Sequence, residues 1–465
     1  MVTDSSGSSV LSTTMGIQAQ REAEPARIGV FDRMRAALSR RPLAVDALLY
    51  LGCACYALVM ATTDKHFGYR VWGAFAVAGY GLALVHTCWL LLTPNARPSR
   101  RRSRWVGVGA IGVVGMLAPM VTLLVRREAS GGDWTDVEGL WNAQPEVWVI
   151  ERSADTLLHT GSPYLDIAAL DRAPHVHDYT PYGPVMALFG LPRALLGGSP
   201  VTDVLTDARV VFALVAVGCV VAALRLLRVP SVPIRGAQLA AVFPLTALTW
   251  ATAGPDLAIV GLIVLAVALA ATDRPVSAAL VCAFVTSAKL IAAPAAVVAG
   301  FVVTSRLGGR ALARFAVVFV GVTALVTVPV YLVNPGAFVE HVLLFPAGLG
   351  EVASPAASPL PGRLIASTGP VGTVIALLLL IAAGLAVLLW LIRRPPRTAA
   401  DAALRIAVGL AAFTLLTTAT RFGYLVYVSV LLGAVLVFRN RTSAPLGAEG
   451  PGSGHHGDPI SSTSS

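Results

Sequence analysis

Long uninterrupted apolar stretches constrain this chain more than any other feature of its sequence. Two of them read WVGVGAIGVVGMLAPMVTLLV, residues 105–125, and VGTVIALLLLIAAGLAVLLWLI, residues 371–392. About 18 consecutive apolar residues are enough to cross the hydrocarbon core of a bilayer as a helix. With 56% hydrophobic and 13% charged residues, the chain is too apolar for a soluble globule. We therefore predict an all-α polytopic membrane protein with about 12 membrane segments, some of them short or re-entrant.

Arginine clusters beside the apolar stretches predict which ends face the cytoplasm. Cytoplasmic loops carry an excess of Lys and Arg. If both termini are cytoplasmic, all of these clusters lie on the cytoplasmic side of the membrane. Segments 126–207 and 334–366 then lie outside the membrane. The formal charge of +10 therefore reflects topology and not nucleic-acid binding, since no basic domain is present. We expect a multi-pass protein of the plasma membrane. The basic clusters lie at 33–41, 97–104, 225–235, 273–274, 306–314, 393–397 and 439–441.

Composition divides the chain into four parts. Residues 1–42 are polar and are predicted to be a disordered cytoplasmic segment, with the first apolar helix acting as a signal anchor. Residues 43–94 hold two transmembrane helices, and 95–438 hold the remaining membrane segments. Residues 439–465 are rich in Gly and Ser and are expected to be a disordered cytoplasmic tail. All five cysteines fall in apolar stretches, which is typical of small buried residues.

Two predicted hairpins, 236–271 and 277–304, are too short for ordinary spans. Their arms of about 12 to 15 residues reach only about 18 to 22 Å, less than the hydrocarbon thickness. Both flanks of each hairpin are basic, so both tips point away from the cytoplasm. Either the membrane is thinned around them, or the tips stop inside it and are shielded by protein, as irregular backbone at membrane depth requires. The two tips carry Asp256 and Lys289.

Lys289 is unusual because the whole chain contains only two lysines, Lys65 and Lys289. A charged group at membrane depth is costly and implies a partner or a ligand. One interpretation is a buried pair of Lys289 with Asp256 or another acid. The interpretation that we favour is a site for an anionic headgroup.

The longest polar segment, 126–207, holds twelve of the 25 acidic residues of the chain. Within it, EVWVIERSADTLL has a helical apolar stripe, so we predict an amphipathic interfacial helix that stops before Gly161. The later stretch DYTPYGPVMALFGLP is fixed by prolines and carries aromatic residues. That pattern favours a loop with a defined folded surface over a loop whose only role is to be solvated.

The order of several motifs carries a family resemblance. After an acid and a helix come LLHTGSPYL, YTPYGPVMALFGLP, a Pro-Asp hairpin tip and AFVTSAKLIAAP. This order resembles integral-membrane glycosyltransferases of the GT-C type. More narrowly it resembles glycosyltransferase family 87, which includes the polyprenol-phosphate-mannose-dependent α-mannosyltransferases of actinobacteria. Segments 340–364 and 418–427 extend the resemblance, which covers residues 105–438. Residues 43–94 then are an added helix pair, and 95–438 a GT-C-like domain.

The resemblance implies inverting sugar transfer on the outer face of the membrane. The donor is a polyprenyl-phosphate-linked sugar, with mannose preferred and arabinofuranose an alternative, and the acceptor is a lipid-linked or cell-envelope glycan. A carboxylate must take the proton of the acceptor hydroxyl. We favour Asp136, which with Asp133 lies nearest the preceding span, where GT-C enzymes usually place this acid. Members of the resembled family usually place an acid about fourteen residues before the glycine that corresponds to Gly161, and this instead favours Glu146.

The leaving phosphate requires fixed positive charge. The candidates are Lys289, Arg421 and His341, although Arg421 could be an interfacial anchor and His341 an ordinary packed histidine. We assign no metal, because two histidines and an acid at 175–178 recur by chance, and no cofactor beyond the donor, with dependence on a divalent metal left open. The expected substrate-binding residues are Tyr164, Tyr179, Tyr182 and Asp256.

Two other functions remain open. A lipid or solute transporter also needs many spans, broken helices and intramembrane charge, but the sequence shows no convincing inverted repeat. A noncatalytic scaffold would leave Lys289 without an evident purpose. The partners that we expect are the bilayer, the polyprenyl-phosphate sugar and a glycolipid or glycan acceptor.

Overall fold

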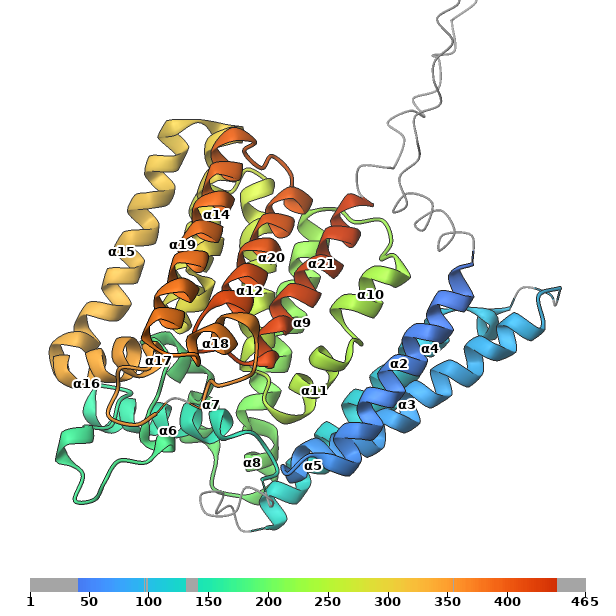
Figure 1. Cartoon of the computed structure of the whole chain (residues 1–465), viewed down its shortest axis with the longest axis horizontal. Coiled ribbons are helices and arrows are strands. Elements are labelled where there is room, and N and C mark those ends of the chain that lie inside the picture. The colour runs from blue at the N-terminus through green and yellow to red at the C-terminus, as the bar shows by residue number, and fades with distance from the viewer. Residues whose placement is uncertain (1–40, 96, 98, 131–140, 354, 441–465) are drawn as a thin grey trace, which may run out of the picture.

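The computed structural model describes residues 41–95, 97, 99–130, 141–353 and 355–440, and this part of the chain is built from helices (Figure 1). Within these residues no β-strand forms, and one isolated bridge joins Ala357 to Thr420. In the described part of the chain, nine helices are long and apolar enough to cross a membrane, or up to ten when a bent pair is counted as one span. The all-α polytopic fold predicted from the sequence is therefore confirmed.

The long spans owe their length to long apolar stretches, and several of them begin at Pro or Gly or end at Arg. They are α2 (Pro42–Thr63), α3 (Phe67–Leu92), α4 (Trp105–Ala110) continued by the π-helical η2 (Ile111–Leu117) and α5 (Ala118–Ala129), α8 (Pro200–Thr206) with α9 (Ala208–Leu226), η7 (Leu290–Ala292) with α14 (Ala293–Leu307), α15 (Gly309–Val333), α19 (Pro370–Arg393), α20 (Ala399–Leu416), and η9 (Phe422–Tyr424) with α21 (Leu425–Arg439).

Both hairpins form, but two arms differ from the prediction: the arm 290–304 belongs to η7 and α14, which together are long enough to cross a membrane, and the arm 236–249 is divided between two helices. In the first, the chain bends by 119° at its tip, where Gly254 has a φ of +87° that favours glycine. In the second, the chain becomes extended at Lys289 before the next helix begins. The helices of the hairpins other than α14 are α10 (Ile234–Ala240), α11 (Pro244–Thr252), α12 (Pro255–Ala271) and α13 (Pro275–Ala288).

Short helices from the two large polar loops gather at one end of the molecule, and we call them the outer layer, after the side that the sequence predicts for these loops. Its longest member, α6 (Pro145–Thr160), ends where the sequence predicts, because Gly161 takes a φ of +78° and closes the helix. The described chain begins and ends at the opposite end (Figure 1). The other members are η4 (Ile167–Ala169), η5 (Val176–Asp178), η6 (Pro184–Phe189), α7 (Leu191–Leu196), α16 (Pro335–Val339), η8 (Glu340–Leu344), α17 (Phe345–Ala347) and α18 (Pro361–Ala366).

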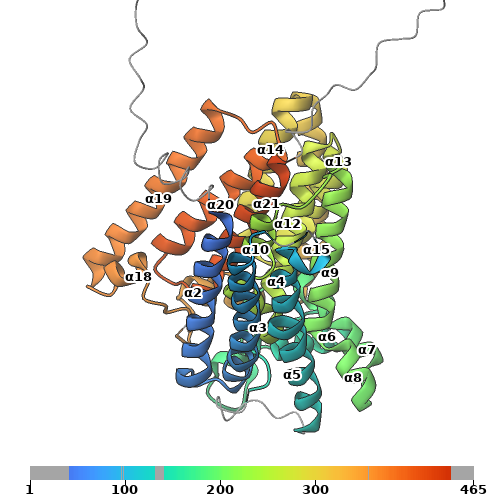
Figure 2. The same cartoon turned by 90° about the vertical axis from the view of Figure 1, so that its right-hand side faces the viewer.

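The interior is organised around α12. Every residue of this helix except Asp256 and Leu265 is buried, and α9, α13, α14, α20 and α21 share its apolar cluster. A second cluster joins α2 and α3 to α4, η2, α5, α10 and α11, and Figure 2 shows α2 to α5 standing together in front of α10 and α12. The helices that 43–94 was predicted to form are therefore packed directly against the rest of the fold.

Candidate active site

The two hairpin tips meet in an ion pair. Lys289 at the end of α13 binds the Oδ1 atom of Asp256 in the first turn of α12, and the Tyr427 hydroxyl donates to the same oxygen at 2.5 Å. The side chains of Lys289 and Asp256 are 11% and 17% exposed. An acid at a helix N-terminus and a cation at a C-terminus both complement the helix dipole. The pairing that the sequence left open is thus present.

Two tyrosine rings flank the Lys289 ammonium. Its Nζ lies 5.5 Å from the ring centroid of Tyr182 and 5.2 Å from that of Tyr424, which are favourable cation–π distances. One ring comes from the outer layer and the other from the start of the last span. The cation is thereby held between the outer layer and the membrane helices.

Gly183 explains why the YTPYGP stretch can approach this point so closely. Its amide donates to the carbonyl of Ala288 at 2.9 Å. A Cβ atom at this position would lie 2.1 Å from the carbonyl oxygen of Ser287, so no side chain fits without movement of the backbone. The proline-fixed stretch is therefore seated directly on the tip that carries Lys289.

A second ion pair lies beside the first. Glu146, in the first turn of α6, binds Arg421 just before η9, and their side chains are 18% and 38% exposed. Burial first, then the charges of Glu146 and Asp256, raise the pKa of Tyr182 well above its usual value. The Tyr182 phenol therefore lies within the field of both pairs. We call Glu146, Arg421, Asp256 and Lys289 the open cluster.

Sequence reasoning missed Tyr424 and Tyr427, although a pattern pointed to them. Arg421, Tyr424 and Tyr427 are spaced by three residues, which places them on one face of a helical segment. The structure brings all three to the open cluster.

The helix pair α2 and α3 also reaches this region, which the sequence did not indicate. The Tyr69 hydroxyl of α3 contacts Nε2 of Gln144, two residues before Glu146. The backbone N–H of Gln144 donates to the carbonyl of Thr252, near the first hairpin tip, at 2.9 Å. The start of α6 is therefore held from both sides.

His341 occupies a different position from the other phosphate-site candidates. It is 0% exposed: the Thr180 amide donates to its Nδ1 atom at 2.8 Å, and its Nε2 atom lies 2.9 Å from the Leu165 carbonyl. Because Nδ1 accepts, the proton must be on Nε2. Burial lowers its pKa to about 4. Both nitrogens are used by backbone groups, so the structure places His341 as a neutral brace of the outer layer.

Tyr164 and Tyr179 belong to the same brace. Both rings lie against His341, with centroids 5.3 and 5.4 Å away, and both side chains are buried. The Tyr164 hydroxyl donates to the Tyr182 carbonyl at 2.9 Å. Of the three tyrosines expected to bind substrate, Tyr182 is the one beside the open cluster.

Asp133 and Asp136 lie outside the described residues. The described chain on either side of them is joined, since Nδ2 of Asn142 donates to the Ser130 hydroxyl at 3.2 Å.

The histidines at 175–178 do not form a metal centre with their acid. Asp178 instead accepts from Arg172 at 2.6 and 2.7 Å. In the described ranges, no group of three or more His, Cys, Asp or Glu side chains could hold a metal ion.

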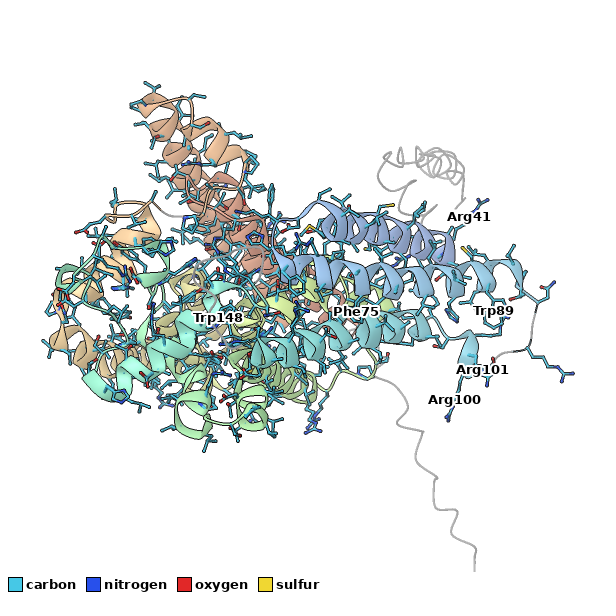
Figure 3. All side chains as sticks on the ribbon, turned by 90° about the horizontal axis from the view of Figure 1, so that it is seen from below. Arg41, Phe75, Trp89, Arg100, Arg101 and Trp148 are labelled. Atoms are coloured by element: carbon cyan, nitrogen blue, oxygen red, sulfur yellow. The ribbon has the colours of Figure 1, made fainter. Side chains whose placement is uncertain are left out.

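A second charged group was also missed, and we call it the sealed network. Asp207 binds Arg127 at 2.5 Å and Arg209 at 2.9 Å, and Arg127 binds Glu151 at 2.6 Å. All four side chains are at most 9% exposed. The Arg127 guanidinium also lies over the ring of Trp148, 4.6 Å from its centroid, and Trp148 is labelled in Figure 3. This network fastens α6 to α5 and α9.

Fold and site together define a polytopic membrane protein in which an acid and a cation at two hairpin tips lie beside a second acid–cation pair, formed between α6 and the segment before the last span. Residues 179–419 match the model of glycosyltransferase family 87, which is more than half of the chain. The protein therefore belongs to glycosyltransferase family 87, and its fold agrees with a GT-C type membrane glycosyltransferase. No curated protein and no solved structure matches the chain.

Proposed function

We propose that this glycosyltransferase moves a sugar from a polyprenyl-phosphate donor to a glycolipid or cell-envelope glycan at the outer face of the plasma membrane. Mannose is the leading candidate for the sugar. One observation carries the proposal: the open cluster brings together two cations and two acids, all partly exposed, where the hairpin tips with Asp256 and Lys289 meet Glu146 of α6 and Arg421 before η9. A phosphate at the head of a lipid needs cations at this depth, and an acceptor hydroxyl needs a base.

In the proposed reaction, Lys289 and Arg421 bind the donor phosphate. Negative charge on this phosphate rises as the bond between the anomeric carbon and the phosphate oxygen breaks. Fixed cations in a site that excludes water stabilise that charge at little cost of reorganisation. Asp256 and Tyr427 keep Lys289 in place before the donor arrives.

The same binding step supplies a base. In the described state Arg421 pairs with Glu146, so the guanidinium occupies the carboxylate that the acceptor hydroxyl would need. When Arg421 turns to the phosphate, the Glu146 carboxylate is released and accepts the proton of the acceptor hydroxyl. The acceptor oxygen attacks the anomeric carbon opposite the leaving phosphate, so the configuration inverts. Asp136 and Asp133 are the alternative bases, because the sequence places them near the end of the preceding span.

The other predicted residues take supporting roles in this proposal. Tyr182 contacts the sugar next to Lys289. Tyr164, Tyr179 and His341 hold the outer layer in position.

The test uses membranes that contain the full-length protein, radiolabelled polyprenyl-phosphate mannose and extracted acceptor glycolipid. Glu146→Gln, Asp133→Asn and Asp136→Asn are compared with Asp155→Asn, a matched control whose side chain on α6 is 63% exposed. Loss of the base should lower the rate by about 10²-fold or more, whereas the control keeps its activity.

Full transfer by all three acid variants would remove the proposed base. Absence of transfer with any polyprenyl-phosphate sugar, together with protein-dependent lipid movement in vesicles, would favour a transporter instead.

A further inference from the structure

A cavity of about 380 Å³ opens at the end of the molecule opposite the outer layer. One wall is apolar and consists of Leu43 at the start of α2 and Leu90 and Leu91 at the end of α3, followed by Pro94. The other wall is formed by Arg102 of η1 (Arg100–Arg102) and Arg104. The cavity therefore joins a hydrocarbon-like surface to two guanidinium groups.

Both guanidinium groups are held in place by neighbours. Arg102 donates to the hydroxyl and carbonyl of Thr93 and lies over the Trp89 ring, 5.2 Å from its centroid. Arg104 donates through Nε and Nη2 to Asp46 at 2.6 and 2.9 Å. An anion that binds here meets arginines whose rotamer entropy has already been lost, which favours affinity.

The positive charge around the cavity exceeds the negative charge. Asp46 is 1% exposed and is shared by two arginines, because Arg235 also binds it at 3.0 Å. Arg102 has no carboxylate among its described contacts. Arg100 and Arg101 are exposed beside it, and Figure 3 shows both with Trp89 at the far end of α2 and α3. This excess attracts an anion.

Two tryptophans indicate the depth of the cavity. Trp89 and Trp105 are both 42% exposed, and exposed tryptophans at the ends of spans typically lie at headgroup level. An anion at this level, with an apolar wall beside it, has the chemistry of a phospholipid.

We propose that this cavity binds one anionic phospholipid, with its phosphate on Arg102 and Arg104 and an acyl chain against Leu43, Leu90 and Leu91. A topology role for these arginines requires only their charge, whereas the cavity adds shape and fixed geometry. The bound lipid would join α2 and α3 to the loop that leads into α4. This site is separate from the open cluster, so the proposal does not depend on the proposed reaction.

The test is native mass spectrometry of the full-length protein released from vesicles that contain equal amounts of phosphatidylglycerol and phosphatidylcholine. Wild type should retain phosphatidylglycerol about 30-fold better than phosphatidylcholine, as expected for two arginine contacts. The variant Arg100→Gln/Arg102→Gln removes one of the two phosphate contacts and its exposed neighbour, leaves Arg104 on the buried Asp46, and should lose most of this preference. Leu91→Trp, which fills the apolar wall and keeps every arginine, should lose it as well.

The matched control is Arg310→Gln/Arg314→Gln, which removes the same charge from exposed residues of α15. It should keep the preference of wild type. An equal loss in the control would overturn the proposal in favour of general surface charge. Displacement of phosphatidylglycerol by millimolar inorganic phosphate would also overturn it, because the site would then be one for a free anion. So would retention of the lipid by Leu91→Trp.

Discussion

The open cluster and the sealed network both consist of acidic and basic side chains. They differ in how exposed these side chains are to solvent and in how many oppositely charged partners each one has. In the sealed network one carboxylate, Asp207, binds two arginines, and it is 1% exposed. In the open cluster each cation has one acid, and exposure ranges from 11% for Lys289 to 38% for Arg421. Saturated, dry charges are suited to holding helices together. Singly paired, accessible charges can exchange a protein partner for a substrate.

The difference in burial between the two groups predicts different effects of mutation. Removing one partner of a buried pair leaves an uncompensated charge, so the sealed network should show its effect on folding. The open cluster should show its effect on transfer.

The largest effect is expected for Asp207→Asn. The buried Arg209 would lose its counterion and the buried Arg127 would keep only Glu151, at a cost of about 3 to 5 kcal/mol. Thermal unfolding followed by size-exclusion chromatography should show a large loss of folded protein. The control Asp203→Asn, whose side chain is 20% exposed, should lose less than about 1 kcal/mol. An equal stability for both variants would mean that the network does not hold the fold.

The next effect concerns Lys289 in the open cluster. Lys289→Met should lower transfer by about 10² to 10³-fold, because a cation at the leaving phosphate is lost. Since Asp256 is then left unpaired, the double variant Asp256→Asn/Lys289→Met separates folding from function. It should fold like wild type and remain inactive. Recovery of transfer in the double variant would show that this pair is structural, as in the sealed network.

The brace around His341 should make the outer layer sensitive to acid. The pKa of His341 is about 4 in the folded protein against 6.5 for an unperturbed histidine. Between these values the unfolded chain binds more protons, so stability falls as pH drops from about 6.5 towards 4, by up to about 3 kcal/mol, and is constant above. Unfolding temperatures across this range should show the decline, and His341→Gln should reduce it. The same slope in both proteins would contradict this role.

The smallest effect is expected for Gly183→Ala. The added methyl would meet the Ser287 carbonyl and push the YTPYGP stretch away from the Lys289 tip, at a cost of about 1 to 3 kcal/mol. Transfer should fall more than the yield of folded protein. Gly218→Ala, where nothing lies within 4 Å, serves as the control. Unchanged transfer in Gly183→Ala would show that this contact does not position the open cluster.

Much of the fold could be predicted because its causes are local. Apolar stretches of sufficient length specify spans in any context, and Gly161 ends α6 through its own backbone conformation. The short hairpins were visible from arm length and from the basic flanks. The site could be predicted only in part. Lys289, Asp256 and Arg421 were noticed because charge is rare in such surroundings, but the pairing of Arg421 with Glu146 joins residues 275 positions apart.

The sequence by itself determined that this chain is a helical membrane protein with interrupted hairpins, because bilayer thickness, charge and backbone chemistry act along the chain. Only the tertiary structure decided which acids are sealed and which are open, and that His341 is a brace. It also showed that the N-terminal helix pair reaches the start of α6 through Tyr69. Those outcomes depend on which side chains meet across long separations and on how far water is excluded there, and no local pattern encodes either.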